Sequence, residues 1–278
     1  MRKFILSCII FSLIGCSLIV IITSYLALTD RYKFTVAGSE IYRSIFKSKQ
    51  KNKTKKIIIG DSVGNQLFPN TTNDDTINSL TCNQAVSMVG HFILLNNYLN
   101  AGNKVDTVVL IYSPSSFRNN LNQIYTFHYF LKPFYIDEYK PLFTKKVTEQ
   151  IKKIPYSNFC RFSVVLTSNW APNFISTDTI KYSFLSPISI EYITKIKDLS
   201  NKHNFKLIIL PTPIRFNGKS DVEGIDKNEI LNNGLATVFE NYFENIIFLH
   251  DSCFLDGTHL KSEYVKNYSD YYRNKLMR

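Results

Sequence analysis

The chain has 278 residues, with 33 lysines and arginines against 22 aspartates and glutamates, and a formal net charge of +11. Residues 1–56 hold 11 of the basic and 2 of the acidic side chains, so residues 57–278 are nearly neutral. A nucleic-acid-binding domain needs a basic surface on its folded part, and no basic motif with interleaved aromatic residues follows Lys56. Charge therefore argues against nucleic acid as a partner, and residues 57–278 suffice for one domain with a sizeable core.

Residues 4–28 form an uncharged, mostly apolar segment behind Arg2 and Lys3. As a helix, this segment would be about 37 Å long, which is enough to span a bilayer with some tilt. A cleaved export signal begins in the same way, and residues 13–16 (Leu-Ile-Gly-Cys) have the form of a lipoprotein cleavage box. Because the apolar run continues to Leu28, we expect an uncleaved signal anchor over residues 1–30.

Basic residues follow this segment at Arg31, Lys33 and Arg43 and in the run Lys47–Lys56. Counted alone, they would place this side of the membrane in the cytoplasm. Large domains are nevertheless exported largely regardless of charge, and a short basic stretch before an apolar segment is the ordinary export signal. We therefore expect a single-pass membrane protein with an extracytoplasmic domain, periplasmic or on the cell surface, and a solvated linker over residues 31–56. The alternative is that the lysines contact anionic lipid headgroups.

Beyond the linker, short apolar runs alternate with longer segments of helical period. This pattern is typical of an α/β fold with a mostly parallel sheet, so we expect residues 57–278 to form a three-layer α/β sandwich. The predicted strands are residues 56–59, 76–81, 105–112, 207–210 and 246–249. The predicted helices are residues 91–99, 188–203, 226–243 and 261–277.

Residues 114–178 interrupt the alternation with 65 residues that include 14 phenylalanines, tyrosines and tryptophans. Such a segment is too long to be a bare loop. One interpretation is a helical insertion whose aromatic side chains form its own core. The other is a lid above the strand ends, where open α/β sheets bind their ligands, with Tyr129 and Phe130 contacting the substrate.

Two motifs carry the residues of nucleophilic catalysis. Gly60-Asp61-Ser62 follows the first predicted strand, and Asp256-Gly-Thr-His259 lies between the last predicted strand and the final predicted helix. A serine needs a base within hydrogen-bonding reach and an acid that orients this base. Asp256 and His259 can touch at the start of a helix, and Ser62 can face them across the common edge of a parallel sheet. Alternatively, the first motif is only a turn, Asp256 caps a helix and His259 packs on it.

With these motifs in this order, residues 56–278 resemble the SGNH (GDSL-like) hydrolase superfamily. The resemblance implies acyl-ester chemistry, with Ser62 as the nucleophile, His259 as the general base and Asp256 as the acid that orients it. The apolar N-terminus and the sequence Ser-Pro-x-x-Phe at residues 113–117 also resemble the membrane-anchored branch of the superfamily. That branch includes the D-alanine transfer protein of teichoic acid modification, with alginate O-acetylation proteins as a looser parallel. Its serine works in acyl transfer to cell-envelope polymers.

The resemblance also implies donors for an oxyanion hole. The first is the backbone N–H of Ser62, and the second-block donor falls at Met88, with Gly90 two residues beyond. The asparagine of the third block is absent from residues 112–117, and losing such a donor costs about a hundred- to a thousandfold in rate. The candidates to replace it are Ser115, Ser116, Asn119 and Asn120.

Arg215 follows a predicted strand and two prolines, and it is a candidate contact for a substrate carboxylate or phosphate, although prolines there often only shape a turn. The other histidines and the cysteines lack metal-ligand spacing, so we expect no metal and no cofactor. They are His91, His128, His203 and His250, and Cys8, Cys16, Cys82, Cys160 and Cys253.

The sequence thus predicts a serine esterase or O-acyltransferase that acts on an ester of a cell-envelope carbohydrate or polymer. A membrane-bound acyl-donor protein is a candidate partner. The alternatives are a non-catalytic binding or scaffold protein that keeps the fold, and an anion-binding domain that uses the turn at Ser62.

Overall fold

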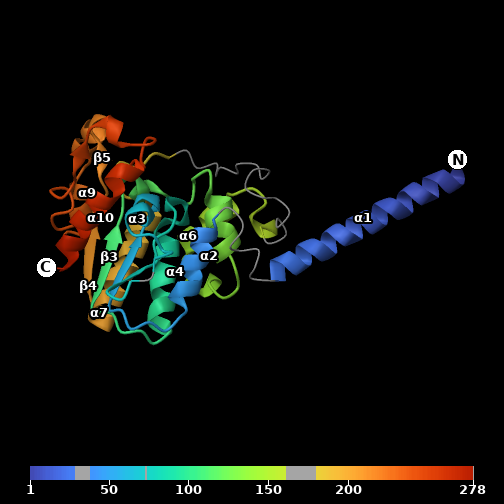
Figure 1. Cartoon of the computed structure of the whole chain (residues 1–278), viewed down its shortest axis with the longest axis horizontal. Coiled ribbons are helices and arrows are strands. Elements are labelled where there is room, and N and C mark those ends of the chain that lie inside the picture. Colours follow the sequence, from blue (N-terminus) through green and yellow to red (C-terminus); the bar gives the residue numbers. More distant parts are fainter. Residues whose placement is uncertain (29–37, 73, 161–179, 278) are drawn as a thin grey trace.

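The computed structural model describes residues 1–28, 38–72, 74–160 and 180–277. Its centre is a four-stranded sheet in the order β2-β1-β3-β4 (Figure 1). All three strand pairings are parallel, so the carboxyl ends of the strands lie at one edge of the sheet. This arrangement confirms the predicted α/β fold with a parallel sheet. The strands are β1 (Lys56–Gly60), β2 (Ile77–Ser79), β3 (Thr107–Ile111) and β4 (Lys206–Leu210).

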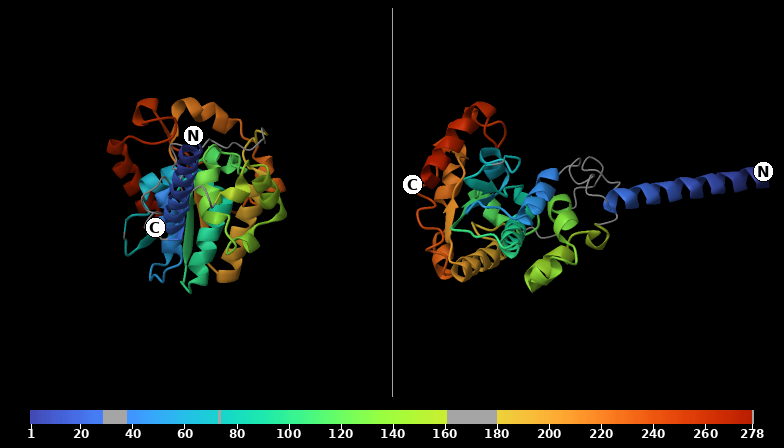
Figure 2. Two further views of the ribbon diagram at one scale, coloured as in Figure 1. Left: turned by 90° about the vertical axis from the view of Figure 1, so that its right-hand side faces the viewer. Right: turned by 60° about the horizontal axis from the view of Figure 1, so that its bottom comes forward.

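Apolar side chains cover both faces of the sheet, which explains the continuous apolar runs of the central strands. On one face, Ile57 and Ile59 belong to a large core cluster with α4 (Ser87–Asn100) and α7 (Pro187–His203). On the other face, Ile58 belongs to a smaller cluster with α3 (Ser62–Leu67) and α10 (Ser262–Met277). The helices therefore form one layer on each side of the sheet (Figure 2).

The last predicted strand does not join this sheet. β6 (Phe248–Leu249) pairs in parallel with β5 (Ile214–Arg215), and the two form a separate sheet. The predicted helix over residues 226–243 is also wrong, because α9 (Asn228–Asn232) is a short helix that ends just before Gly234. This glycine has a φ of +66°, a left-handed conformation that commonly ends helices.

The expected solvated linker is wrong for residues 39–48, which form a helix of the domain, whereas residues 49–53 are exposed. Residues 31–37 of the predicted linker lie outside the described chain. Helix α2 (Ser39–Ser48) buries Ile41, Ser44 and Ser48, which share one helical face, and it packs against α4. The Ser44 hydroxyl donates a hydrogen bond of 2.9 Å to the carbonyl of Thr81. Composition did not reveal this helix, because it leads directly into the lysine run. Its one lysine, Lys47, is partly buried, and its Nζ donates to the carbonyl of Asn70 at 3.0 Å.

The described part of the predicted insertion consists of short helices: η3 (Pro114–Arg118), η4 (Phe127–Leu131), α5 (Lys132–Phe134), η5 (Lys140–Leu142), α6 (Lys145–Lys152) and η6 (Ser157–Phe159). Its largest rings are buried in the same core cluster as α4 and α7: Phe117, Phe127, Phe130, Phe134 and Tyr139. These five buried rings therefore form neither a separate core nor a lid, but extend the core of the domain. Residues 161–178 of the predicted insertion lie outside the described residues.

Helix α1 (Arg2–Leu28) stands apart from the domain (Figure 1). Its segment Arg2–Ile22 has a mean hydropathy of 2.9 and is long and apolar enough to cross a membrane. None of this segment is buried against the rest of the described chain. Cleavable export signals share this length and composition, so the helix is a candidate membrane span and equally a candidate export signal.

Gly60 lies where β1 and β3 end side by side. A Cβ atom at this position would come within 2.4 Å of the backbone oxygen of Ile111. We therefore expect Gly60→Ala to lower the free energy of unfolding by about 1–3 kcal/mol, because one of the two backbones must shift. Gly218→Ala is the control, since its Cβ would meet only a side-chain methyl of Ile214 at 3.4 Å. Thermal unfolding of the detergent-solubilised chain checks this, and equal transition temperatures for both variants would contradict it.

Candidate active site

Ser62 is the first residue of α3 and stands directly beyond the carboxyl end of β1. The preceding residue, Asp61, caps the helix, and its Oδ1 accepts hydrogen bonds of 3.1 Å from the N–H groups of Val63 and Gly64. The N–H of Ser62 itself makes no hydrogen bond within the described chain. It is therefore free to donate to a group bound beside the serine hydroxyl.

The carboxylate of Asp61 also holds the end of β3. Its Oδ2 accepts hydrogen bonds from the N–H of Ser113 at 2.8 Å and from the hydroxyl of Ser116 at 2.7 Å. The side chain is buried, and burial raises the pKa of Asp61 while the four hydrogen bonds act in the opposite direction. Asp61 thus joins the turn that carries Ser62 to the turn that follows β3.

His259 lies in a loop closed by an antiparallel bridge between Phe254 and Leu260. Within this loop, Oδ1 of Asp256 accepts hydrogen bonds of 2.7 Å from the N–H groups of Thr258 and His259. The final helix, α10, begins only at Ser262. The expectation that Asp256 and His259 open a helix is therefore wrong, because the loop and its Asp256 turn bring the two side chains together instead.

The structure brings Ser62, His259 and Asp256 into one hydrogen-bonded chain. Nδ1 of His259 is 2.8 Å from Oδ2 of Asp256, and Nε2 is 2.9 Å from Oγ of Ser62. Burial opposes the charge of Asp256, but the hydrogen bonds from His259 and Thr258 outweigh it and lower the pKa of Asp256 to about 2. The side chains of His259 and Asp256 are 36% and 53% exposed, so solvent reaches the site.

Gln66 links helix α3, which carries Ser62, to the loop that carries His259. Its Nε2 donates to the carbonyl of Leu260 at 2.6 Å, and its Oε1 accepts from the N–H of Leu260 at 2.9 Å. Gln66 lies one helical turn after Ser62 on α3, while Leu260 directly follows His259. Gln66 was not among the residues predicted for the site, although its i+4 spacing from Ser62 is the signal that would have placed it on the same helix face.

The structure corrects the second-block oxyanion donors. Met88 and Gly90 both lie in α4 and are buried, so their N–H groups cannot meet a substrate from solvent. The segment that reaches the strand ends comes earlier, because the N–H of Cys82 donates to the carbonyl of Gly60 at 3.0 Å. Partly exposed Asn83 and Gln84 therefore follow β2 at the edge where Ser62 lies.

Of the third-block candidates, only Ser115 is exposed. Asn119 is buried, with its amide donating to the carbonyl of Gln84 at 2.6 Å and its oxygen accepting from the N–H of Leu121. Ser116 is buried and bonded to Asp61, and Asn120 is buried as well. Asn119, Asn120 and Ser116 therefore stabilise the fold, and Ser115 is the one that a substrate can reach.

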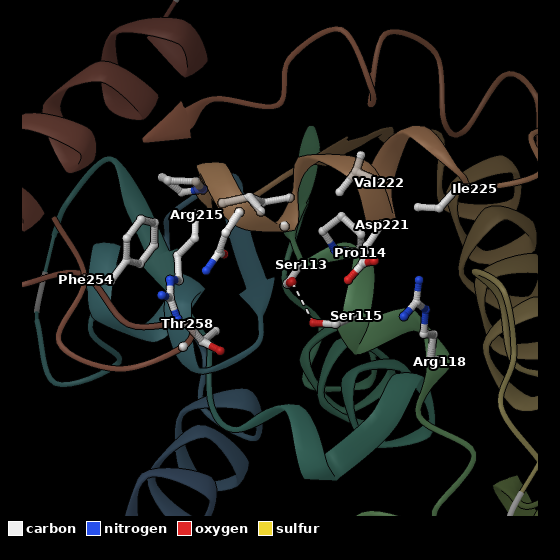
Figure 3. A pocket seen from close by; sticks show the side chains of 15 residues that line it. Ser113, Pro114, Ser115, Arg118, Arg215, Asp221, Val222, Ile225, Phe254 and Thr258 are labelled. Carbon is white, nitrogen blue, oxygen red and sulfur yellow. Dashed lines mark hydrogen bonds between the residues drawn. The ribbon is translucent and has the colours of Figure 1, made fainter. Parts of the chain in front are cut away.

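A pocket of about 330 Å³ adjoins the site, between η3 and the loop that carries His259 (Figure 3). Arg215 lines it, and its Nη2 lies 3.0 Å from Oδ2 of Asp251. Neither Tyr129 nor Phe130 lines this pocket, and Phe130 is fully buried. The predicted substrate contact of Phe130 is therefore wrong, since its ring faces the core.

The histidines His91 and His128 lie in the interior, and burial lowers their pKa values to about 3 and about 4 respectively. Within the part of the chain that the structure describes, no three His, Cys, Asp or Glu side chains come together as a metal site would require.

The chain matches no family model and no curated protein. Among solved structures, it is similar to a "putative acylhydrolase" from Bacteroides fragilis NCTC 9343, with 13% identity, a TM-score of 0.40, and coverage of 86% of this chain and 97% of that one. It is also similar to a "putative platelet activating factor" from Streptococcus pneumonia, with 12% identity, a TM-score of 0.36, and coverage of 86% and 93%. At these scores, neither similarity indicates a function for this chain, and only the geometry of its site does.

Asp61→Asn tests the buried carboxylate. We expect the free energy of unfolding to fall by about 1–3 kcal/mol, because an amide N–H₂ would face the buried N–H of Ser113 and leave it unpaired. Asp226→Asn is the matched control, since Asp226 is exposed and its Oδ1 accepts from the N–H of Asn228, a bond that asparagine preserves. Chemical denaturation reports both values, and an unchanged midpoint for Asp61→Asn would refute this role.

Gln66→Met tests the connection between Ser62 and His259. Methionine has a similar length and cannot form the two bonds to Leu260, so we expect kcat for an activated ester to fall about 10- to 100-fold with little change in KM, because small misplacements of reacting groups are costly. The control is Gln50→Met, on an exposed glutamine after α2. A change confined to KM, or to thermal stability, would show that Gln66 does not position the pair.

Proposed function

We propose that this protein is a serine-dependent ester hydrolase or O-acyltransferase with Ser62, His259 and Asp256 as its catalytic residues. The observation that carries the proposal is the continuous hydrogen-bonded chain from Asp256 through His259 to Ser62, with distances of 2.8 and 2.9 Å. Serine, imidazole and carboxylate in this arrangement form the unit that activates a hydroxyl nucleophile in unrelated folds.

The chemistry follows from the contacts. Because Nδ1–H of His259 donates to Asp256, Nε2 is the free base that takes the proton from Ser62 as its Oγ attacks an ester carbonyl. The same proton then passes from Nε2 to the leaving alcohol, and an acyl-serine forms. In the second half of the reaction, Nε2 takes a proton from water or from an acceptor hydroxyl as its oxygen attacks the acyl group. Nε2 then returns this proton to Oγ of Ser62, and the acyl product leaves.

The oxyanion of each tetrahedral intermediate needs hydrogen-bond donors that stabilise its negative charge. The unpaired N–H of Ser62 supplies one. The exposed hydroxyl of Ser115 is the side-chain donor that we propose in place of an asparagine; it lies 2.9 Å from the hydroxyl of Ser113. Each hydroxyl can rotate, so Ser113 can accept or donate as Ser115 turns toward the substrate.

Hydrolysis and transfer differ only in the nucleophile of the second half. The exposed side chains of His259 and Asp256 admit water, which favours hydrolysis of a small ester. Transfer requires an acceptor held in place, and the pocket beside Ser115 has room for one sugar unit or a short acyl group. With α1 retained as an anchor and the domain outside the cytoplasm, we propose that the ester belongs to a cell-envelope carbohydrate or polymer, and that a membrane-bound protein can supply the acyl group.

A second candidate is a non-catalytic binding or scaffold protein with this fold. The buried Asn119, where an oxyanion donor was expected, is the observation that favours it. Such a protein would keep the pocket and the fold without an acyl-serine.

The decisive experiment is labelling of the detergent-solubilised full-length chain with a fluorophosphonate, followed by kinetics with 4-nitrophenyl acetate. We expect labelling at Ser62 that is lost in Ser62→Ala and in His259→Ala. We expect Asp256→Asn to lower kcat by about 10⁴-fold, since the imidazole then takes the wrong tautomer. The exposed Asp226→Asn keeps full activity as the control.

Folding of each variant is checked by circular dichroism. A well-folded wild type that neither labels nor turns over more ester than Ser62→Ala would favour the binding protein. Addition of a glycan acceptor then separates the remaining activities, because a transferase yields acylated glycan in proportion to the acyl-serine consumed.

A further inference from the structure

The pocket beside the site contains a second arginine, Arg118, whose hydrogen-bonding groups are only partly used. It is the last residue of η3, the helix that also carries Ser115. Its Nε donates to the carbonyl of Ser183 at 2.9 Å, which fixes the plane of the guanidinium group. The two terminal nitrogens make no hydrogen bond or ion pair within the described chain, and they face the pocket (Figure 3).

The other charged groups of the pocket do not balance Arg118. Arg215 on the opposite wall is paired with Asp251, so its charge is already compensated. Asp221 also lines the pocket, but it forms no ion pair with Arg118 within 4.0 Å. Arg118 thus presents an open pair of donors in a fixed plane, the geometry that matches two oxygens of a carboxylate or a phosphate.

Hydrogen bonds also connect η3, which carries Arg118, to the turn that carries Ser62. The N–H of Ser113 and the hydroxyl of Ser116, both within or next to η3, bind the carboxylate of Asp61 beside Ser62. An anion held by Arg118 would therefore be fixed relative to the nucleophile through one short helix.

We propose that Arg118 binds an anionic group of the substrate, a carboxylate or a phosphate, through its two terminal nitrogens. This inference rests on the proposed function, and it names the substrate class: an acidic acyl group or an acidic sugar unit. Asp221 and Asn217, which line the same pocket, supply polar contacts for hydroxyl groups of that unit.

The first test compares two esters with the same leaving group, neutral 4-nitrophenyl acetate and anionic 4-nitrophenyl hemisuccinate, on the full-length chain. We expect the ratio of kcat/KM for the anionic over the neutral ester to fall about 10- to 100-fold in Arg118→Gln, the range for hydrogen bonds to a charged group. Arg118→Lys keeps the charge but loses the planar pair of N–H donors, so we expect its ratio to lie between those of the wild type and Arg118→Gln. Lys202→Gln, at the exposed end of α7, is the charge-matched control.

The second test measures binding without turnover. Glucose, glucuronate and glucose 6-phosphate are titrated against the wild type and Arg118→Gln by calorimetry. Stronger binding of glucuronate or glucose 6-phosphate than of glucose, lost in Arg118→Gln, supports an anionic sugar and shows whether a carboxylate or a phosphate is preferred.

The two proposals fail in different ways. An anion preference that depends on Arg118 in either test supports the inference, even when the wild type shows no turnover and the proposed esterase activity is thereby refuted. Turnover of both esters with the same ratio in wild type and both Arg118 variants, together with equal binding of the three sugars, would overturn the inference while leaving the esterase in place.

Discussion

The carboxylate of Asp61 is the constraint on which the site depends. It is a buried charge, which is costly, and four hydrogen-bond donors from two separate turns compensate for it. Two of these donors begin α3 and orient Ser62, and the other two belong to the turn that leads to Ser115. A single carboxylate therefore sets the position of Ser62 relative to the wall of the pocket. Close backbone contact at Gly60 makes this arrangement possible.

Much of the fold and the hydrogen-bonded chain of Asp256, His259 and Ser62 could be predicted, because the signals are local. Apolar runs bounded by turns indicated the parallel sheet, and Gly60-Asp61-Ser62 at the end of the first run placed the serine at the correct edge. The spacing of Asp256 and His259 indicated contact between them, although they lie in a loop and not at the predicted helix start. The aromatic residues were harder, since their number does not say which way each ring faces, and burial of Phe130 follows from packing against distant helices.

The second-block donor could not be predicted for a different reason. The segment that reaches the edge of the sheet where Ser62 lies is set by the pairing of β2 with β1, where the N–H of Cys82 donates to the carbonyl of Gly60. This register is a long-range property, and a shift of a few residues along the chain exchanges the partly exposed Asn83 and Gln84 for the buried helix that contains Met88. Gln66 escaped notice for the same reason, since its partner Leu260 is 194 residues away in sequence.

The packing of α2 on α4 also limits the distance that can separate the domain from α1. With a free linker up to residue 56, the chain between α1 and the domain would be 28 residues long and could extend about 95 Å at 3.3–3.6 Å per residue. Because α2 is part of the domain, only residues 29–38 remain, and their maximum reach is about 35 Å. With α1 retained as the proposed anchor, the point where the domain begins stays within about 35 Å of the lipid surface. Substrates that are themselves held at that surface would then meet the domain at a high effective concentration.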